Sequence, residues 1–479
     1  MTHSPPSSSS SAVDVVAANQ RLNEIPIKIY PRTVKGLFAN LRWVMVWVTQ
    51  LVFYGFPWLL WNERQAVLFD IAHSRFYIFG LVLHPQDLIY LALLMVWAAL
   101  TLFFFTALAG RLWCGYACPQ TVYTEIFMWL ERRIEGDRQA RMRLDKAPWG
   151  VEKVTRKSGK QLAWIGWSLL TGFTFVGYFT PIRELWGELL TLSFSALEWF
   201  WVLFYGLATY GNAGFLREQI CKQMCPYARI QSALTDMDSM VIAYDTTRGE
   251  PRGSRPRGAN PQSLGLGHCV DCTLCVQVCP TGIDIREGLQ NECIGCAACI
   301  DVCDEVMTRL NYPKGLIKYS SGRGMAERLS APQMLRRSWR PRVWFYGVLF
   351  LLMASLFIGG LSTRKGFAVD IIRDRGTMAR EVGNGDIENL YRLKVMNTSE
   401  QQRTYSVQAS GLPGLALRTP PQLSVAPAGI GALTVRLALP AQAAQALRGK
   451  SSPIAFEIVS DDPADTRVVI EKSTFLVPR

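Results

Sequence analysis

The sequence predicts a polytopic α-helical membrane protein with a cysteine-rich soluble domain and a C-terminal all-β domain. Three observations predict this class. Five stretches are long and apolar enough to cross a membrane, eight cysteines repeat one spacing twice, and the cysteine-free C-terminal region alternates short strands with turns. The chain has 479 residues, which is enough for two or three such domains.

The N-terminal segment, residues 1–36, opens with a tail rich in Ser and Pro. It lacks the basic and then apolar layout of a signal peptide. We therefore expect a disordered cytoplasmic segment in front of the first membrane span.

Five apolar stretches have the length of a membrane-spanning helix, which needs roughly 20 residues. The fourth stretch carries Glu198, and a buried acid in a span is costly, so we expect this carboxylate to face a partner or cavity, or to lie at the interface. Four stretches belong to a membrane region, 37–214, and one follows the soluble region. The predicted spans are 37–61, 88–109, 162–179, 189–210 and 343–361.

Basic residues are distributed unequally between the loops, within a formal net charge of +13. Loops 62–87 and 180–188 hold two and one Lys or Arg, whereas 111–160 and 211–342 hold eleven and seventeen. The positive-inside rule places the two basic segments and the N-terminus in the cytoplasm, and the C-terminal domain outside. All twelve cysteines fall on the predicted reducing side, which agrees.

Two C-x3-C-P motifs follow the second and fourth spans and form an internal repeat. Residues at i and i+4 share a helix face, so Cys114 with Cys118, and Cys221 with Cys225, are expected to offer paired sulfurs. Such soft ligands favour Cu(I), zinc or an iron–sulfur cluster, and Met224 is a weaker candidate ligand. Cysteines that only pack helix ends, or a redox dithiol, are the alternatives.

The cytoplasmic region, 215–342, contains a ferredoxin-like domain at 262–311. Two C-x2-C-x2-C-x3-C runs are the bacterial pattern for two [4Fe–4S] clusters, in which the fourth cysteine of each run ligates the other cluster. Zinc ribbons would use paired knuckles at longer separation, and disulfides would need an oxidising compartment. The expected ligands are Cys269, Cys272, Cys275 and Cys303 for the first cluster, and Cys293, Cys296, Cys299 and Cys279 for the second.

The C-terminal region, 365–479, predicts a β-sandwich of immunoglobulin-like type. It lacks the Cys…Trp…Cys signature of true immunoglobulin domains. The expected strands are 391–395, 404–408, 433–437, 454–459 and 468–470.

Several functional classes are excluded. None of the four histidines lies in a predicted span, so the sequence excludes a bis-histidine haem in the membrane. There is no P-loop and no dinucleotide fingerprint in strand–helix context, so we do not expect oxidation of NAD(P)H by this chain alone. No nucleic-acid-binding module is present.

The motifs together resemble the cytochrome c oxidase accessory proteins of the FixG/CcoG type. The resemblance rests on R-L-W-C-G-Y-A-C-P-Q-T-V-Y-T-E-I-F at 111–127, C-P-T-G-I-D-I-R-E-G-L-Q at 279–290 and C-I-D-V-C-D-E-V-M at 299–307. It extends over nearly the whole chain. Membrane polyferredoxins of nitrate and nitrous-oxide respiration share the paired C-x3-C-P motifs, but the full combination is more specific.

The resemblance implies a bacterial inner-membrane protein with a periplasmic C-terminal domain. It implies reduction of Cu(II) to Cu(I) during assembly of cbb3-type oxidase, with oxidase subunits and copper-transfer proteins as partners and an unidentified electron donor. Two alternatives stay open. One is a quinol-linked electron conduit to a partner protein, and the other is a non-enzymatic assembly scaffold.

Overall fold

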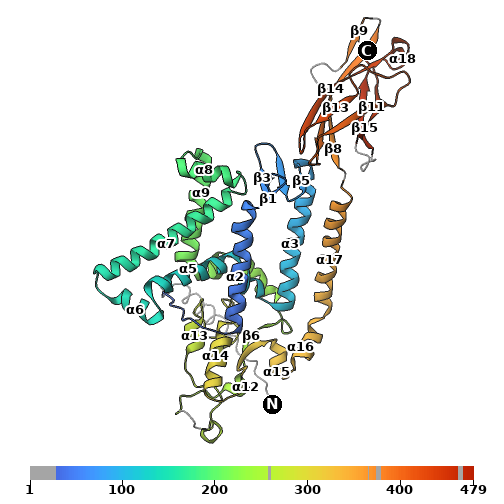
Figure 1. Ribbon diagram of the computed structural model, residues 1–479. Coiled ribbons are helices and arrows are strands. Elements are labelled where there is room, and N and C mark those ends of the chain that lie inside the picture. Colours follow the sequence, from blue (N-terminus) through green and yellow to red (C-terminus); the bar gives the residue numbers. More distant parts are fainter. Residues whose placement is uncertain are drawn as a thin grey trace, which may run out of the picture. The chain divides into compact units, whose positions relative to one another are not determined.

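The computed structural model describes residues 28–256, 260–364, 366–373, 379–383, 385–461 and 468–478 (Figure 1). The chain folds into two units, each assembled from three separate segments. The first unit comprises Met1–Val44, Ala109–Trp164 and Asn212–Met334, and the second comprises Met45–Leu108, Ile165–Gly211 and Leu335–Arg479. All twelve cysteines belong to the first unit.

Three helical segments in the described ranges are long and apolar enough to cross a membrane: Leu37–Trp58, Pro85–Ala109 and Pro341–Ser362. They contain α2 (Leu37–Gly55), α3 (Leu88–Ala109) and α17 (Pro341–Ser362), which are drawn in Figure 1. These helices match the first, second and fifth predicted spans. Exposed Leu, Val, Met and Trp side chains cover their surfaces, as a lipid environment requires.

The fourth predicted span, 189–210, is not one helix. Helices α8 (Ile182–Thr191) and α9 (Ala196–Thr209) are bent by 97° at the intervening turn, which makes a broken span or a re-entrant loop. The break occurs where Ser195 caps α9. Its hydroxyl accepts the Glu198 N–H, and the Glu198 carboxylate accepts the Ser195 N–H at 2.9 Å. Glu198 is thus a capping residue at a helix start.

The third predicted span, 162–179, overlaps α7 (Val151–Val176), which begins earlier because the charged segment before it is also helical, and which ends three residues before the predicted end. With this charged end, α7 is not among the helices long and apolar enough to span. The described ranges therefore contain three candidate spans, or four if α8 and α9 form one. The five-span topology stays a prediction.

The expectation of disorder up to residue 36 is wrong for residues 28–36. These residues have no regular secondary structure, yet they are held by partners far away in sequence. The Arg32 N–H donates to the Gln277 carbonyl at 2.8 Å, and Arg138 donates to the Tyr30 carbonyl at 2.9 Å. The rest of that prediction, 1–27, lies outside the described residues.

The ferredoxin domain extends beyond the predicted range of 262–311. Its helices α13 (Leu274–Val278) and α14 (Ala298–Arg309) pack with β6 (Val241–Tyr244) and β7 (Ile317–Ser320), which pair antiparallel. Ile242 and Ile317 on these strands are buried in the same core as Cys269 and Cys275. In the sequence, β6 precedes the two cysteine runs and β7 follows them, so the paired strands begin and end the domain.

The C-terminal region is a β-sandwich, as predicted, and all five expected strands are confirmed. One sheet has the order β12-β14-β10-β8 with β9 on β10, and the other has the order β13-β11-β15-β16. Alternate side chains of both sheets meet in one core. The strands are β8 (Phe367–Arg373), β9 (Arg380–Val382), β10 (Asp386–Asn397), β11 (Arg403–Ser410), β12 (Ala416–Leu417), β13 (Gln422–Val425), β14 (Ile430–Leu439), β15 (Ser451–Ser460) and β16 (Val469–Leu476).

Short elements complete the fold. A three-stranded sheet, β3-β4-β5, occupies the loop before α3, where the sequence predicted no strand. Further elements include β1 (Leu60–Trp61), β2 (Arg64–Gln65), β3 (Val67–Asp70), β4 (Arg75–Ile78), β5 (Leu81–Leu83), α4 (Leu112–Tyr116), α5 (Pro119–Glu135), α6 (Arg138–Lys146), η3 (Tyr210–Leu216), α10 (Arg217–Gln219), η4 (Ile220–Met224), α11 (Pro226–Leu234), α12 (Thr246–Gly249), α15 (Gly322–Ala326), α16 (Ala331–Ser338) and α18 (Ala441–Gln445).

A buried tyrosine joins the two sheets of the sandwich. Tyr391 on β10 is fully buried, and its hydroxyl donates to the Thr474 carbonyl on β16 at 2.8 Å. Replacing Tyr391 with Phe removes the hydroxyl, so the Thr474 carbonyl loses this hydrogen bond. We expect the free energy of unfolding of the domain to fall by about 1–2 kcal/mol.

No tryptophan lies beyond Trp344, so resistance to protease in urea is the suitable measurement of this domain's unfolding. The control is Ile470→Val, which changes an exposed side chain on β16. Identical urea midpoints for Y391F and the unmodified chain would contradict the assigned role of this hydrogen bond.

Candidate iron–sulfur and sulfur-rich site

The two cysteine runs of the ferredoxin domain adopt the same backbone path. In each run, the residues on either side of the second cysteine have positive φ: Asp271 and Thr273 at 54° and 55°, and Gly295 and Ala297 at 70° and 59°. A short helix then begins and carries the third cysteine. The left-handed residues turn each loop around one cavity, and their strain is typical of a functional site.

The first cavity brings together the four cysteines expected for the first cluster. Cys303 reaches it from the second run, as the exchanged pattern predicts. Arg286 also lines this cavity, and its guanidinium pairs with Asp284 at 2.6 Å. Cys272 is exposed, whereas Cys269 and Cys275 are buried, so this cavity approaches the protein surface on the Cys272 side.

The second cavity is lined by the four cysteines expected for the second cluster, together with Cys275, which also lines the first cavity. Apolar side chains close it, including Ile242, Ile283 and Ile294. Burial raises the pKa of Cys293 to about 12, so the free thiol is protonated at neutral pH and releases a proton when it becomes a ligand. Two thiol-lined apolar cavities of this kind fit two [4Fe–4S] clusters.

The C-x3-C-P motifs differ from the predicted geometry, because each cysteine pair is split between two helices. Cys114 lies in α4, but Cys118 precedes α5 with an extended backbone. Cys221 lies in the π-helical turn η4, and Cys225 precedes α11 in the same way. The proline after each second cysteine excludes helical backbone at that cysteine, so the expectation of one shared helix face is wrong.

This geometry places the second cysteine of each motif at a helix N-terminus, with proline at the first helical position. The backbone N–H groups of Gln120 and Thr121 stabilise the Cys118 thiolate, although burial still raises its pKa overall. Helix N-termini favour the thiolate form of cysteine, which is the form that binds a metal ion. The two motifs repeat this arrangement.

Hydrogen bonds made by two glutamine side chains hold the two motifs together. The Cys114 thiol donates to Gln231 Oε1 at 3.6 Å, and the Gln231 amide donates to the Gly110 carbonyl at 2.9 Å. In the reverse direction, the Gln120 amide donates to the Asn212 carbonyl at 2.9 Å. Each motif therefore anchors residues of the other.

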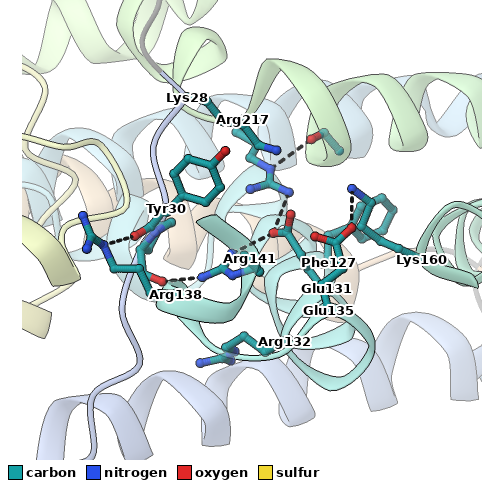
Figure 2. A network of polar contacts seen from close by, with 12 residues as sticks. Lys28, Tyr30, Phe127, Glu131, Arg132, Glu135, Arg138, Arg141, Lys160 and Arg217 are labelled. Carbon is teal, nitrogen blue, oxygen red and sulfur yellow. Dashed lines mark hydrogen bonds and ion pairs between the residues drawn. The ribbon is translucent and has the colours of Figure 1, made fainter. Parts of the chain in front are cut away.

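Buried ion pairs reinforce this association (Figure 2). Glu131 on α5 lies 3.0 Å from Arg141 and 3.1 Å from Arg217, which precedes Cys221 by one turn. The Arg217 guanidinium also lies over the ring of Trp164, 5.4 Å from the ring centroid. Lys160 pairs with Glu135 at 3.0 Å. Because Glu131 is almost fully buried, losing a partner would leave an uncompensated charge.

Burial raises the pKa of the Cys114 thiol to about 12, and the charges of Cys118, Cys221 and Cys225 act in the same direction. Among the residues that the structure describes, no three His, Cys, Asp or Glu side chains converge as ligands of a single ion. Met224 is 63 % exposed, and its role as a weaker ligand stays a prediction.

The first motif packs directly against the loop that carries the second ligand set. A Cβ added to Gly115 would lie 2.7 Å from the Gly295 carbonyl oxygen, and one added to Gly295 would lie 3.0 Å from the Arg111 carbonyl oxygen. Cys114 and Cys221 both pack on the apolar cluster that includes Ile294 and Cys296. Cys114 and Cys221 therefore lie next to the residues that surround the second cluster cavity.

The three histidines that the structure describes each contact a neighbouring side chain. His268 stacks on Tyr312 with ring centroids 5.1 Å apart and does not line either cluster cavity. His73 bonds to Asp70, and the buried His84 forms a capping box with Asp87.

Comparison with known families agrees with this geometry. Residues 216–322 match a "4Fe-4S dicluster domain", 91–136 match a "4Fe-4S binding domain", and 357–478 match the "IG-like fold at C-terminal of FixG". The nitrogen fixation protein FixG of Rhizobium meliloti is 34 % identical over 94 % of this chain and 93 % of its own. Protein RdxA of Cereibacter sphaeroides is 40 % identical over 81 % of this chain and 83 % of its own, and Protein RdxB is 38 % identical over the same shares.

The chain belongs to the FixG family. Its iron–sulfur domains indicate an electron-transfer function, and the apolar helices of this FixG-family chain indicate a membrane protein. The immunoglobulin-like domain expected from the sequence is shown both by the sandwich and by the FixG match. The first C-x3-C-P motif lies inside the match at 91–136, and the second lies inside the dicluster match.

The contact between Gly115 and Gly295 gives a direct test of this site. Replacing Gly115 with Ala inserts a methyl group against a backbone carbonyl, which must displace α4 or the loop that carries Cys293 and Cys296. We expect reduced iron per chain and an altered electron paramagnetic resonance spectrum of the second cluster.

The matched control is Gly166→Ala in α7, where a Cβ meets nothing within 4 Å. This variant should keep its full iron content. Full iron and an unchanged spectrum in G115A would show that the close approach of α4 does not support the second ligand set.

Proposed function

We propose that this FixG-family protein reduces Cu(II) to Cu(I) at Cys114, Cys118, Cys221 and Cys225, for assembly of a cbb3-type cytochrome c oxidase. The observation that carries the proposal is the packing of Cys114 and Cys221 on the group of apolar side chains that includes Cys296, one of the cysteines expected to hold the second iron–sulfur cluster. An electron carrier beside a group of soft sulfurs suits a copper substrate, since thiolates select Cu(I).

When bound, two [4Fe–4S] clusters supply two one-electron carriers, which we assign to the ligand sets predicted from the sequence. The side chains around the two ligand sets determine how accessible each set is. Cys272 is exposed and marks the side at which an electron donor would approach. The cavity with Cys293 and Cys296 is closed by isoleucines, which exclude water from the inner ligand set.

At the paired cysteines, Cu(II) accepts one electron and becomes Cu(I). A cavity adjoins this point, and Cys221, Pro280 and Ile294 are among the residues that line it. A copper ion held there would lie between the paired cysteines and the loops of the second ligand set. Cys114, whose pKa is raised by burial, would release its proton on binding the cation.

The proposed topology follows the distribution of charge. The segments at 111–160 and 211–342, with their excess of Lys and Arg, are cytoplasmic, and the sandwich at 365–479 is periplasmic in a bacterial inner membrane. Oxidase subunits and copper-transfer proteins are the proposed partners. The electron donor is a separate protein or small carrier.

One observation favours a second candidate for the paired cysteines. Residues 91–136 match a 4Fe-4S binding domain although Cys114 and Cys118 are the only cysteines in that range. Together with Cys221 and Cys225 they make four sulfurs, enough for a third cluster. The two candidates differ in iron content, since two clusters hold eight iron atoms per chain and three hold twelve.

The experiment replaces all four of these cysteines with Ser in the full chain. Loss of the soft ligands should lower the rate of Cu(I) formation from Cu(II) at least tenfold, while iron stays at eight atoms per chain. Cu(I) is trapped with a chelator, and iron is measured on the same sample.

The matched control is Cys272→Ser, which removes a ligand of the first cluster and should reduce the iron content. Unchanged copper reduction by the four-serine variant would contradict the copper site. A fall from twelve to eight iron atoms in that variant would establish the third cluster instead.

A further inference from the structure

A cationic cavity lies beside the second ligand set and adjoins the cavity that Cys221 lines, with which it shares Arg42, Glu125 and Pro280. None of the four paired cysteines lines it, and it is here named the arginine cavity. Four arginines and a single carboxylate, Glu125, supply its charged lining. The arginines are Arg32, Arg42, Arg132 and Arg141.

The carboxylate does not satisfy these cations. Glu125 lies 3.6 Å from Arg42 and 3.7 Å from Arg132, and both distances exceed a hydrogen bond. Glu131, the next acid along α5, is already shared by Arg141 and Arg217 (Figure 2). The cavity therefore carries an excess of positive charge.

Two of the guanidinium groups are buried with hydrogen-bonding capacity left over. Arg42 is 9 % exposed and Arg141 is 1 % exposed, and the Nε atom of each has no hydrogen-bond partner. Arg141 uses its other nitrogens on Glu131 and on the Pro31 carbonyl. A buried charge without its full set of partners is costly, and an anion in the cavity would remove that cost.

The surroundings of Arg132, which lies on α5 outside the candidate spans, shift its pKa in both directions. Burial lowers the pKa, Glu125 opposes that change, and repulsion by Arg141 and Arg42 adds to it. A second negative group would offset this repulsion. Guanidinium groups bind phosphate oxygens in paired, planar contacts, so phosphate is the anion that best fits four arginines.

The cavity also lies beside the start of a candidate membrane span. Arg42 and Trp43 lie in the first two turns of α2, whose segment Leu37–Trp58 is long and apolar enough to span. Trp43 meets Trp129 edge to face at 6.5 Å. Tryptophan and arginine together are typical of the level of lipid headgroups.

We propose that the arginine cavity binds the phosphate group of an anionic phospholipid. Val278, Pro280 and Ala298 line the same cavity, and they flank Cys279 and Cys299 of the second ligand set. The headgroup would thus lie against the protein that surrounds the inner cluster. This inference does not depend on copper as the substrate.

The test uses the full chain in nanodiscs of phosphatidylcholine, with or without one-fifth phosphatidylglycerol, and adds inorganic phosphate in a separate arm. Lipid retained after delipidation is measured by mass spectrometry, and thermal unfolding is measured in each arm. The variants are R42Q and R132Q. The matched control is R133Q, because Arg133 faces Trp129 at 5.4 Å and does not line the cavity.

We expect phosphatidylglycerol to be retained and to stabilise the unmodified chain and R133Q, and R132Q to retain it about fivefold less. R42Q should behave like R132Q, and the iron content of each variant reports whether it has folded. Equal retention by R132Q and R133Q would overturn the site. Stabilisation by inorganic phosphate with no preference for phosphatidylglycerol would overturn the lipid as its source.

Discussion

The close approach of two backbones, at Gly115 and Gly295, is the constraint on which the site depends. A side chain at either position would meet a carbonyl at 3.0 Å or less. Because both residues are glycine, α4 lies directly on the loop of the second cysteine run. The sulfur-rich motifs and the inner iron–sulfur ligand set are thereby neighbours, which is the arrangement that a short electron-transfer step requires.

Buried ion pairs near this contact specify how the surrounding elements are arranged. Glu131 and Glu135 are nearly inaccessible, and each is surrounded by cations from other elements, which fixes α5 against the segment that precedes Cys221. Buried pairs of this kind contribute little net stability, but losing one partner is expensive. They therefore specify one arrangement of the two motifs. In the arginine cavity four described arginines face a single carboxylate, and an external anion would offset their charge.

Much of this fold could be predicted from the sequence, because the relevant patterns are local. The exchange of Cys279 and Cys303 between ligand sets follows from the spacing alone, and the cavities group the cysteines in that way. The strands of the sandwich follow from alternation of apolar and polar residues. The break before Ser195 could have been found from its capping box with Glu198, a short signal inside a long apolar stretch.

Other features depend on partners that are distant in sequence. Residues 28–36 are ordered by Gln277 and Arg138, and β6 pairs with β7 across more than seventy residues. The split geometry of each C-x3-C-P motif was visible in principle, since proline restricts the cysteine before it. The ion pairs of Glu131 could not be found, because nothing in the sequence relates α5 to Arg217.

The most direct test of the account is an anaerobic titration of the dithionite-reduced, desalted protein with Cu(II), followed by cluster absorbance and by chelator-trapped Cu(I). Two one-electron carriers should yield two Cu(I) per chain, with the absorbance of the oxidised clusters returning in the same proportion. Clusters that stay reduced while Cu(II) is present would contradict copper as the electron acceptor.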